Sequence, residues 1–269
     1  MEQTTNEILM IRPKNFGYNA LTATNNKFQT PDLASDSLAI SEVALIEFDA
    51  MVAQLRENGI QVNVIEDTSL PLKPDAVFPN NWFSTHADGT IITYPMWAEN
   101  RRIERRNDII LSLQEKYQFD NLLDMETYEE DDMFLEGTGS IIFDRPNRKA
   151  YACLSQRTNK QLLEELCDIL CYDAITFQAL DSQNVPIYHT NVMMCIGEEI
   201  AIICLDSIVE AEEKAKVTNS LKHDKKNILE ISQSQMHQFA GNMLELKGTN
   251  RQKLLMSLTA FESLDEKQI

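Results

Sequence analysis

The 269-residue chain carries 42 Asp and Glu against 24 Lys and Arg, so its formal net charge is −18. This charge repels nucleic-acid phosphates and anionic lipid, which argues against nucleic acid and membranes as partners and would favour a cationic ligand. Hydrophobic residues make up 43% of the chain, enough for a substantial core. The N-terminus has no signal-peptide pattern, and no apolar run approaches the roughly 18 residues of a membrane span. We therefore expect a globular cytoplasmic protein.

The five cysteines are odd in number and lie in apolar surroundings, which is typical of buried thiols in a reducing compartment. Only Cys167 and Cys171 are closely spaced, and no histidine lies near them, so we expect no metal site there. The cysteines are Cys153, Cys167, Cys171, Cys195 and Cys204.

The N-terminal residues predict a strand, a helix and a second strand. The first strand is EILMIR at residues 7–12, and a loop through residues 25–32 follows it. The helix covers residues 41–59 and ends at Gly59, and the second strand covers residues 60–66.

One segment type then recurs four times: an aromatic residue, a few small or polar residues, and two strand-like runs joined by a turn. Each copy predicts a β-hairpin. Measured between the equivalent points Asn81, Gly139, Asn191 and Asn242, the copies are 51 to 58 residues apart, which is typical of supersecondary modules. They begin at Phe78, Phe134, Tyr188 and Phe239.

Three hairpins are followed by a hydroxyl residue three positions before Glu or Gln, which predicts a capping box at a helix start. The pairs are Thr158 with Gln161, Ser207 with Glu210, and Ser263 with Glu266. The repeated unit is therefore hairpin, helix, strand. The last helix would begin at Ser263 and reach Ile269 with no returning strand, so we expect an incomplete fifth module.

Five such modules predict an α/β fold in which the modules close into a ring with a polar site on its axis. We expect one domain over residues 1–269. Its modules would span about 6–70, 71–120, 121–180, 181–232 and a truncated 233–269.

Polar residues stand at the same point of each copy, at the start of the first hairpin strand. A buried carboxylate such as Glu136, in an apolar run, needs a cation or strong donors. His189, between apolar runs, is the best candidate for a general acid and base. The set comprises Asn80, Asn81, Glu136, His189, Asn191 and Asn242.

Two charged runs have simpler interpretations. Residues 129–132 are four consecutive acids without the spacing of a calcium loop, so we expect a solvated loop. Residues 97–106 carry four arginines, which indicate a solvated helix face, or else one arginine that meets a substrate carboxylate.

At these residues the sequence resembles the guanidino-group-modifying superfamily, which includes arginine deiminases, amidinotransferases and dimethylarginine hydrolases. It is most similar to the citrulline-utilisation hydrolase branch. The resemblance implies a five-bladed α/β propeller, the pentein fold. It covers nearly the whole chain, and its most specific motifs are LEGTGSIIFDR, YACLSQRTN, HTNVMM and FAGNMLEL.

The resemblance also implies the substrate contacts. Glu136 and Asn81 would hold the terminal nitrogens of the substrate. Asn81 stands where many relatives have Asp, and the lost negative charge suits a neutral ureido group such as that of citrulline. Phe78 would join the substrate-binding residues.

The remaining roles follow from the same resemblance. His189 would be the general acid and base with Asn191 in support. Arg157 would bind the α-carboxylate of the substrate, and Arg101 or Arg102 is a weaker candidate for that task. No cofactor is implied.

In the family, a cysteine near the C-terminus attacks the guanidino or ureido carbon to form a covalent intermediate. The last cysteine here is Cys204, inside an apolar strand, so we expect a truncated and nearly inactive chain. The leading hypothesis is a hydrolase of citrulline to ornithine plus carbamate or ammonia. The alternatives are an amidinotransferase or arginine deiminase, and a non-catalytic amino-acid-binding relic. The sequence leaves homodimerisation open.

Overall fold

The computed structural model describes residues 1–29 and 37–269, so the end of the expected loop at residues 25–32 lies outside the described residues. The chain forms two compact units. Unit 1 comprises Met1–Thr4, Met133–Leu246 and Gln252–Ile269, and unit 2 comprises Thr5–Asp132 and Lys247–Arg251. The expected single domain and its module boundaries stay predictions.

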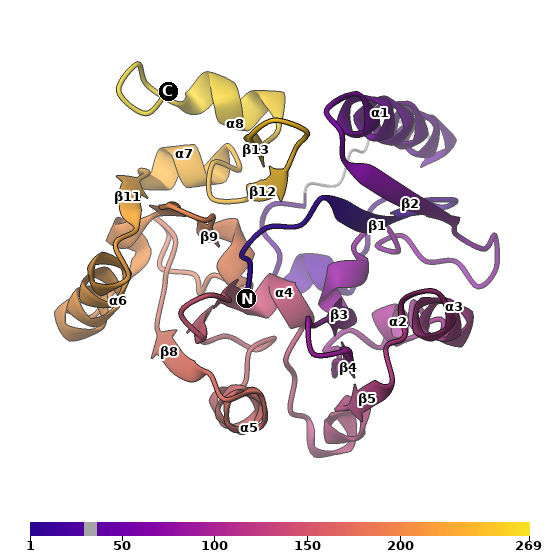
Figure 1. Cartoon of the computed structure of the whole chain (residues 1–269), viewed down its shortest axis with the longest axis horizontal. Helices are drawn as coiled ribbons and strands as arrows, with labels where there is room; N and C mark the ends of the chain where they lie inside the picture. Colours follow the sequence, from indigo (N-terminus) through magenta and orange to yellow (C-terminus); the bar gives the residue numbers. More distant parts are fainter. Residues whose placement is uncertain (30–36) are drawn as a thin grey trace. The chain divides into compact units, whose positions relative to one another are not determined.

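Unit 1 repeats one arrangement: two antiparallel strands, a helix, and a strand that returns parallel to the second one (Figure 1). In the first example, β6 pairs antiparallel with β7, and β8 pairs parallel with β7. Strand β7 is buried along four of its five residues. The elements are α4 (Gly137–Ser140), β6 (Ile142–Asp144), β7 (Lys149–Cys153), α5 (Lys160–Leu170) and β8 (Asp173–Phe177).

The second example in unit 1 has the same order, with β10 at the centre of its sheet. Its elements are the 3-10 turn η4 (Thr190–Val192), β9 (Met194–Ile196), β10 (Ile200–Ile203), the turn η5 (Leu205–Ser207), α6 (Ala211–His223) and β11 (Asn227–Glu230). A two-stranded sheet follows. Its strands are β12 (Leu244–Lys247) and β13 (Gln252–Leu255). Helix α7 (Gln233–His237) precedes the sheet and helix α8 (Leu258–Ser263) follows it.

Unit 2 contains a parallel pair, β1 with β2, and a three-stranded sheet in which β4 pairs antiparallel with β3 and parallel with β5. Its helices and strands are β1 (Glu7–Arg12), α1 (Ser37–Glu57), β2 (Gln61–Glu66), β3 (Phe83–Thr85), β4 (Thr90–Thr93), α2 (Glu99–Arg102), α3 (Asn107–Tyr117) and β5 (Asn121–Asp124). Its 3-10 turns are η1 (Thr22–Thr24), η2 (Pro79–Asn81) and η3 (Glu126–Asp131).

A residue with a positive, left-handed φ stands after each of the helices α1, α3, α5 and α6, where the chain turns back to the strand that completes the sheet. Gly59, Gln118, Cys171 and Lys225 have φ values between 56° and 83°. After three of them, the next backbone N–H bonds back to a carbonyl in the last turn of the helix, as Tyr172 does to Cys167. This left-handed cap reverses the chain toward the sheet. Only the first of the four uses glycine, so only that one was recognisable in the sequence.

Unit 2 has an apolar core between its two sheets and α3. Trp82 and Ile91 are fully buried there, and Ile11 of β1 packs with them. Burial of such side chains contributes roughly 1.5–3 kcal/mol each.

Within unit 1, polar side chains tie neighbouring sheets together. The Gln3 amide donates to the carbonyls of Phe143 and Ile196 at 2.9 and 3.0 Å and accepts from the Arg145 N–H at 2.8 Å. The buried Lys226 Nζ lies 3.5 Å from Asp144 Oδ1. These contacts join β6 to the sheet that contains β9.

The structure confirms the hairpins predicted from the repeat: β3–β4, β6–β7 and β9–β10 are antiparallel, and β12 pairs with β13. The fold is mixed α/β. No closed sheet occurs among the described residues, and the five-bladed ring stays a prediction.

The predicted capping boxes were wrong. Helix α5 is capped by Asn159, whose side chain accepts from the Leu162 N–H, because Thr158 is held in β-bridges to Leu135 and Ser155. Helix α6 starts after Glu210, without a side-chain cap. Helix α8 is capped by Ser257 and ends at Ser263 instead of beginning there.

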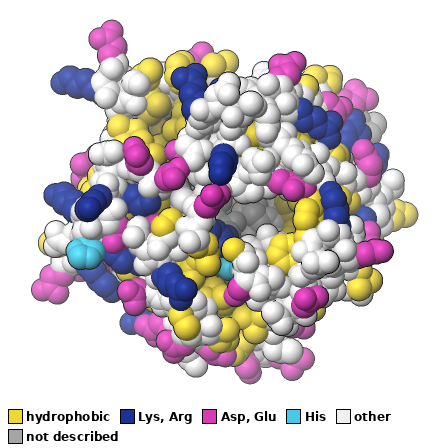
Figure 2. All heavy atoms as spheres, in the orientation of Figure 1, with side chains coloured by type: hydrophobic (Ala, Val, Ile, Leu, Met, Phe, Trp, Pro, Cys, Tyr) yellow, Lys and Arg dark blue, Asp and Glu magenta, His cyan; other side chains and the backbone are white. Residues whose placement is uncertain are grey.

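None of the described helices is both long enough and apolar enough to cross a membrane. Figure 2 shows Asp and Glu side chains spread over the face in view, with Lys and Arg between them.

Candidate functional site

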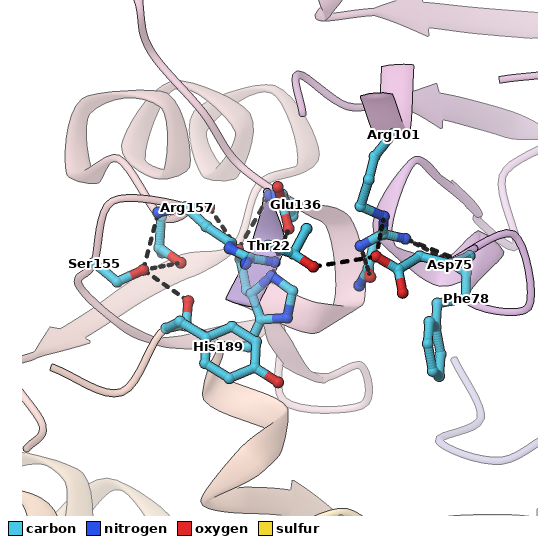
Figure 3. Close-up of polar contacts among 12 residues, drawn as sticks. Thr22, Asp75, Phe78, Arg101, Glu136, Ser155, Arg157 and His189 are labelled. Carbon is cyan, nitrogen blue, oxygen red and sulfur yellow. Dashed lines mark hydrogen bonds and ion pairs between the residues drawn. The ribbon is translucent and has the colours of Figure 1, made fainter. Parts of the chain in front are cut away.

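Three predicted site residues of unit 1 meet in one buried cluster (Figure 3). Glu136 precedes the short helix α4, and His189 precedes the turn η4. Arg157 lies in the loop between β7 and α5. Glu136 and His189 therefore each stand immediately before the short helical turn that leads into a hairpin, whereas the repeat predicted them at the start of the first hairpin strand.

The Glu136 carboxylate is the centre of this cluster. Its Oε2 atom lies 2.7 Å from His189 Nε2 and 3.4 Å from Arg157 Nη1. The exposed fractions of the three residues are 0%, 4% and 2% for Glu136, His189 and Arg157. Because an ionised carboxylate only accepts hydrogen bonds, the Nε2–H of His189 is the donor in its contact with Glu136.

Arg157 is held through its side chain by Tyr188 and through its backbone N–H by Ser155. Its guanidinium carbon lies 4.8 Å from the centre of the Tyr188 ring, a cation–π contact. The Ser155 hydroxyl accepts from the Arg157 N–H at 3.1 Å and donates to the Tyr188 carbonyl at 2.7 Å. The proposed contact of Arg157 with a substrate carboxylate stays a prediction, while the structure pairs it with Glu136.

Hydroxyl groups that the sequence analysis missed fix the backbone of the cluster. Ser140 Oγ donates to the Arg157 carbonyl at 2.8 Å and accepts from the Glu136 N–H at 3.1 Å. Thr190 Oγ1 donates to the Ser140 carbonyl and accepts from the Cys153 N–H at 2.8 Å. The sequence feature that could have identified Ser140 and Thr190 is their position inside the motifs EGTGS and HTN.

Asn191 lies next to the cluster in η4, and its backbone carbonyl accepts from Asn242 Nδ2 at 2.9 Å. The preceding Gly241 is required by packing, because a Cβ there would lie 2.4 Å from the Val192 carbonyl oxygen. Gly241 and Asn242 of the FAGN motif therefore pack against the turn η4, which follows directly after His189. A supporting role of the Asn191 side chain stays a prediction.

Unit 2 holds a second polar cluster around Arg101 (Figure 3). Asn81, which is 5% exposed, accepts from Arg101 Nη1 through Oδ1 at 2.8 Å. Nε and Nη2 of Arg101 donate to the two oxygens of Glu104, each at 2.9 Å. Asp75 Oδ2 lies 3.7 Å from Arg101 Nε and accepts from Asn19 Nδ2 at 2.7 Å.

The prediction of a solvated arginine face was wrong for Arg101, which is 2% exposed. Arg102, the residue proposed from the resemblance, points instead to Glu129, with Nε 3.2 Å from Oε2. Glu129 also pairs with Arg105, so the acidic run is not a simple solvated loop. These residues were misassigned because opposite charges distant in sequence meet only in the fold.

Phe78 leaves its side chain exposed at 44%, and its carbonyl accepts from the Asn81 N–H at 3.2 Å. Asp75, Glu104 and Asn19 were missed by the sequence analysis. Asp75 and Asn19 are single polar residues in loops, and Glu104 lies within the arginine run, so none of the three gives a sequence signal of burial.

Four of the five cysteines have thiols that favour the protonated form. Burial raises the pKa of Cys153 and Cys167 to about 12, and desolvation does the same for Cys195. Burial also raises the pKa of Cys204. Cys171 is exposed, contrary to the expectation of buried thiols, and caps α5. Because the thiolate is the nucleophile, a raised pKa makes the four thiols unreactive near neutral pH.

Native protein is therefore expected to expose one fast-reacting thiol per chain to a disulfide reagent, at Cys171, and all five thiols after denaturation. The count is read from the absorbance of the released reagent. Replacing Cys171 with serine should remove the fast phase. A second fast thiol in the native protein would contradict this assignment.

The family model described as N,N-dimethylarginine dimethylhydrolase, eukaryotic, matches residues 12–269. None of the curated protein sequences matches the chain.

Solved structures resemble the fold. ArgZ, an arginine dihydrolase from the ornithine–ammonia cycle in cyanobacteria, is 18% identical with a TM-score of 0.69. The match covers 95% of this chain and 36% of the ArgZ chain, so this chain spans about a third of that protein. The substrate-bound N-terminal domain of ArgZ is 17% identical with a TM-score of 0.70, covering 95% of this chain and 86% of that domain.

A third similar structure is DDAH from Pseudomonas aeruginosa, solved as a cysteine-to-serine mutant with citrulline. It is 15% identical with a TM-score of 0.63, and the match covers 99% of this chain and 88% of that one. At these identities the structural similarity concerns the fold.

Proposed function

The chain belongs to the N,N-dimethylarginine dimethylhydrolase family of the guanidino-group-modifying superfamily, and on this premise we propose that it binds an amino acid ending in a ureido group. Citrulline is the preferred ligand. The reaction to which this site is suited, given an attacking thiol other than the five cysteines of this sequence, is hydrolysis to ornithine and carbamate or ammonia. A reducing, cytoplasmic location is part of the proposal, which the five free thiols support.

The observation that carries the proposal is the charge balance at Glu136. Its negative charge is already matched by Arg157, whose Nη1 lies 3.4 Å away in a buried setting. A second cation such as a guanidinium would add uncompensated charge where water is excluded, which is costly. A neutral ureido group adds none.

Asn81 supports the same preference. Arginine can only donate, so the atom of Asn81 that meets Arg101 is Oδ1, and the Nδ2 donors are left for other partners. A ureido oxygen can accept from Nδ2, whereas a guanidinium has no acceptor. The citrulline found in DDAH from Pseudomonas aeruginosa is consistent with a ureido ligand on this fold.

In the proposed reaction, His189 takes the proton of the attacking thiol, and the thiolate attacks the ureido carbon. The bond to the ornithine nitrogen then breaks, and His189 passes that proton to the leaving amine. It then takes a proton from the water that cleaves the carbamoyl thioester, which releases carbamate and regenerates the thiol. Glu136 orients His189 through Nε2.

We assign the attacking thiol to none of the five cysteines in this sequence, because four have raised pKa values and Cys171 lies at the end of α5. Residues 1–269 are then expected to bind the ligand without turning it over. This keeps the non-catalytic binding relic as a second candidate function. Amidinotransferase and arginine deiminase chemistry remain the enzymatic alternatives, separated by product analysis with an acceptor amine.

The test is the melting temperature with citrulline, arginine and lysine. Citrulline should raise it, since a ligand at a hundred times its Kd stabilises the native state by about 2.7 kcal/mol. Arginine should raise the melting temperature less than citrulline does. Lysine, which has neither a ureido nor a guanidino group, should leave the melting temperature unchanged. Replacing Asn81 with Asp should shift the preference toward arginine, because a carboxylate accepts from a guanidinium.

The control is Asn227→Asp, the same chemical change at an exposed position in β11. It should leave the ligand preference unchanged. Equal stabilisation by arginine and citrulline would overturn the ureido preference, and ornithine released from citrulline at an enzymatic rate would overturn the assignment of the thiol.

A further inference from the structure

Helix α1 of unit 2 has two apolar faces. On the inner face, Phe48, Val52 and Leu55 are buried, with exposed fractions of 5–6%. On the opposite face, Val43 and Ile46 are 54% and 69% exposed. An amphipathic helix of a monomeric domain normally shows one apolar stripe.

The exposed apolar residues follow a regular register. They are spaced alternately by four and three residues, the heptad spacing of a helix-packing seam. Single exposed apolar residues are ordinary on protein surfaces, but a continuous row over about four helical turns is not. We call this row the α1 stripe; its members are Ala39, Val43, Ile46, Ala50 and Ala53, all exposed.

We propose that the α1 stripe is a self-association surface on which the α1 helices of two copies of this chain pack antiparallel. The stripe has its larger residues in its N-terminal half and alanines in its C-terminal half. An antiparallel partner therefore sets Val43 against Ala53 of the second copy, and Ile46 against Ala50 of the second copy. Large residues meet small ones throughout, which allows close packing.

The charges beside the stripe favour the same orientation. Glu42 and Arg56 lie on one flank, near opposite ends of the helix. Two antiparallel copies bring Glu42 of each next to Arg56 of the other, so the contact contains this pair twice. A parallel arrangement would instead bring Glu42 toward Glu47 of the second copy. Flanking charges of this kind set the orientation of helix pairs.

Asp49, on the same flank, is already neutralised within its own chain. Arg12 donates to both of its carboxylate oxygens at 2.7 and 2.8 Å. Asp49 therefore opposes the approach of a second copy less than a bare carboxylate would.

One helix from each copy buries a limited area, at the low end of specific interfaces, below about 1,200 Å² in total. The association is therefore reversible and depends on concentration. A two-fold contact of this kind closes on itself and stops at a dimer.

The first test is sedimentation velocity over a wide concentration range. The wild-type chain should shift from monomer to dimer as concentration rises. Ile46→Glu places a charge in the seam and should weaken the dimer by about tenfold or more. Ile169→Glu makes the same change at a 52% exposed position of α5 and should leave the dimer unchanged.

The second test uses the flanking charges. Glu42→Arg and Arg56→Glu should each weaken self-association, whereas an equal mixture of the two variants should dimerise, because every pair in the mixed dimer is opposite in sign. Melting temperatures show whether each variant is folded. A wild-type chain that stays monomeric, a dimer that tolerates Ile46→Glu, or a mixture no stronger than its components would overturn the proposal.

Discussion

Replacing Glu136 with alanine is expected to lower the free energy of unfolding by about 3–5 kcal/mol, because it leaves a buried guanidinium without its counter-charge. Arg157 is 2% exposed, and its Nη1 forms an ion pair with Glu136 Oε2 at 3.4 Å. His189 Nε2 would lose its 2.7 Å contact in the same variant. The measurement is the midpoint and slope of urea-induced unfolding.

The matched control is Glu164→Ala on α5 of the same unit. Glu164 is 53% exposed and lies 3.7 Å from Lys160, so its loss should cost between about 0 and 1 kcal/mol. If both variants unfolded at the same urea concentration, the buried cluster would not stabilise the fold as described.

Glu136→Gln separates the structural role from ligand binding. Glutamine keeps the volume and one acceptor oxygen, so the loss of stability should be smaller than in the alanine variant. A folded Glu136→Gln protein that no longer responds to citrulline would assign Glu136 to the ligand. A full response to citrulline would remove Glu136 from the proposed binding residues.

Replacing Arg101 with leucine is expected to have a similarly large effect in unit 2. The change leaves Glu104, whose side chain is 1% exposed, without the two donors that hold its oxygens at 2.9 Å. It also removes the guanidinium whose Nε lies 3.7 Å from Asp75 Oδ2. The expected loss is about 3–5 kcal/mol of unfolding free energy, measured by urea-induced unfolding.

Arg102→Leu is the control, since Arg102 is on the same short helix but is 27% exposed and pairs with Glu129. It should cost about 1 kcal/mol or less. The double variant Arg101→Leu with Glu104→Leu should recover part of the loss, because an apolar pair replaces a buried ion pair at little cost. A double variant less stable than Arg101→Leu alone would show that Arg101 matters mainly through Asn81 and Asp75.

Much of the fold was predictable from the sequence because its signals are local. Strand-like runs joined by turn residues located the hairpins, since both are features of residues close together in the sequence. The helix starts were not predictable in the same way. The hydroxyl residues Thr158 and Ser207 match the capping pattern, yet the first is held in β-bridges and the second bonds to Cys204.

The candidate site likewise has features that local sequence signals predicted and features that only the tertiary contacts show. The sequence by itself determined that Glu136 and His189 occupy equivalent points of a repeat, each in an apolar run, and the structure places them 2.7 Å apart. The resemblance to a family supplied the proposed chemistry. Only the tertiary structure decided that Arg101, and not its neighbour Arg102, is the buried arginine.

The tertiary structure also decided which atom of Asn81 faces Arg101 and which thiols are shielded from water. The physical reason is that a backbone pattern depends on residues a few positions apart, whereas the partner of a polar side chain is chosen among residues far apart in sequence. Burial and pairing are therefore properties of the packed chain, and the sequence pattern alone does not carry them.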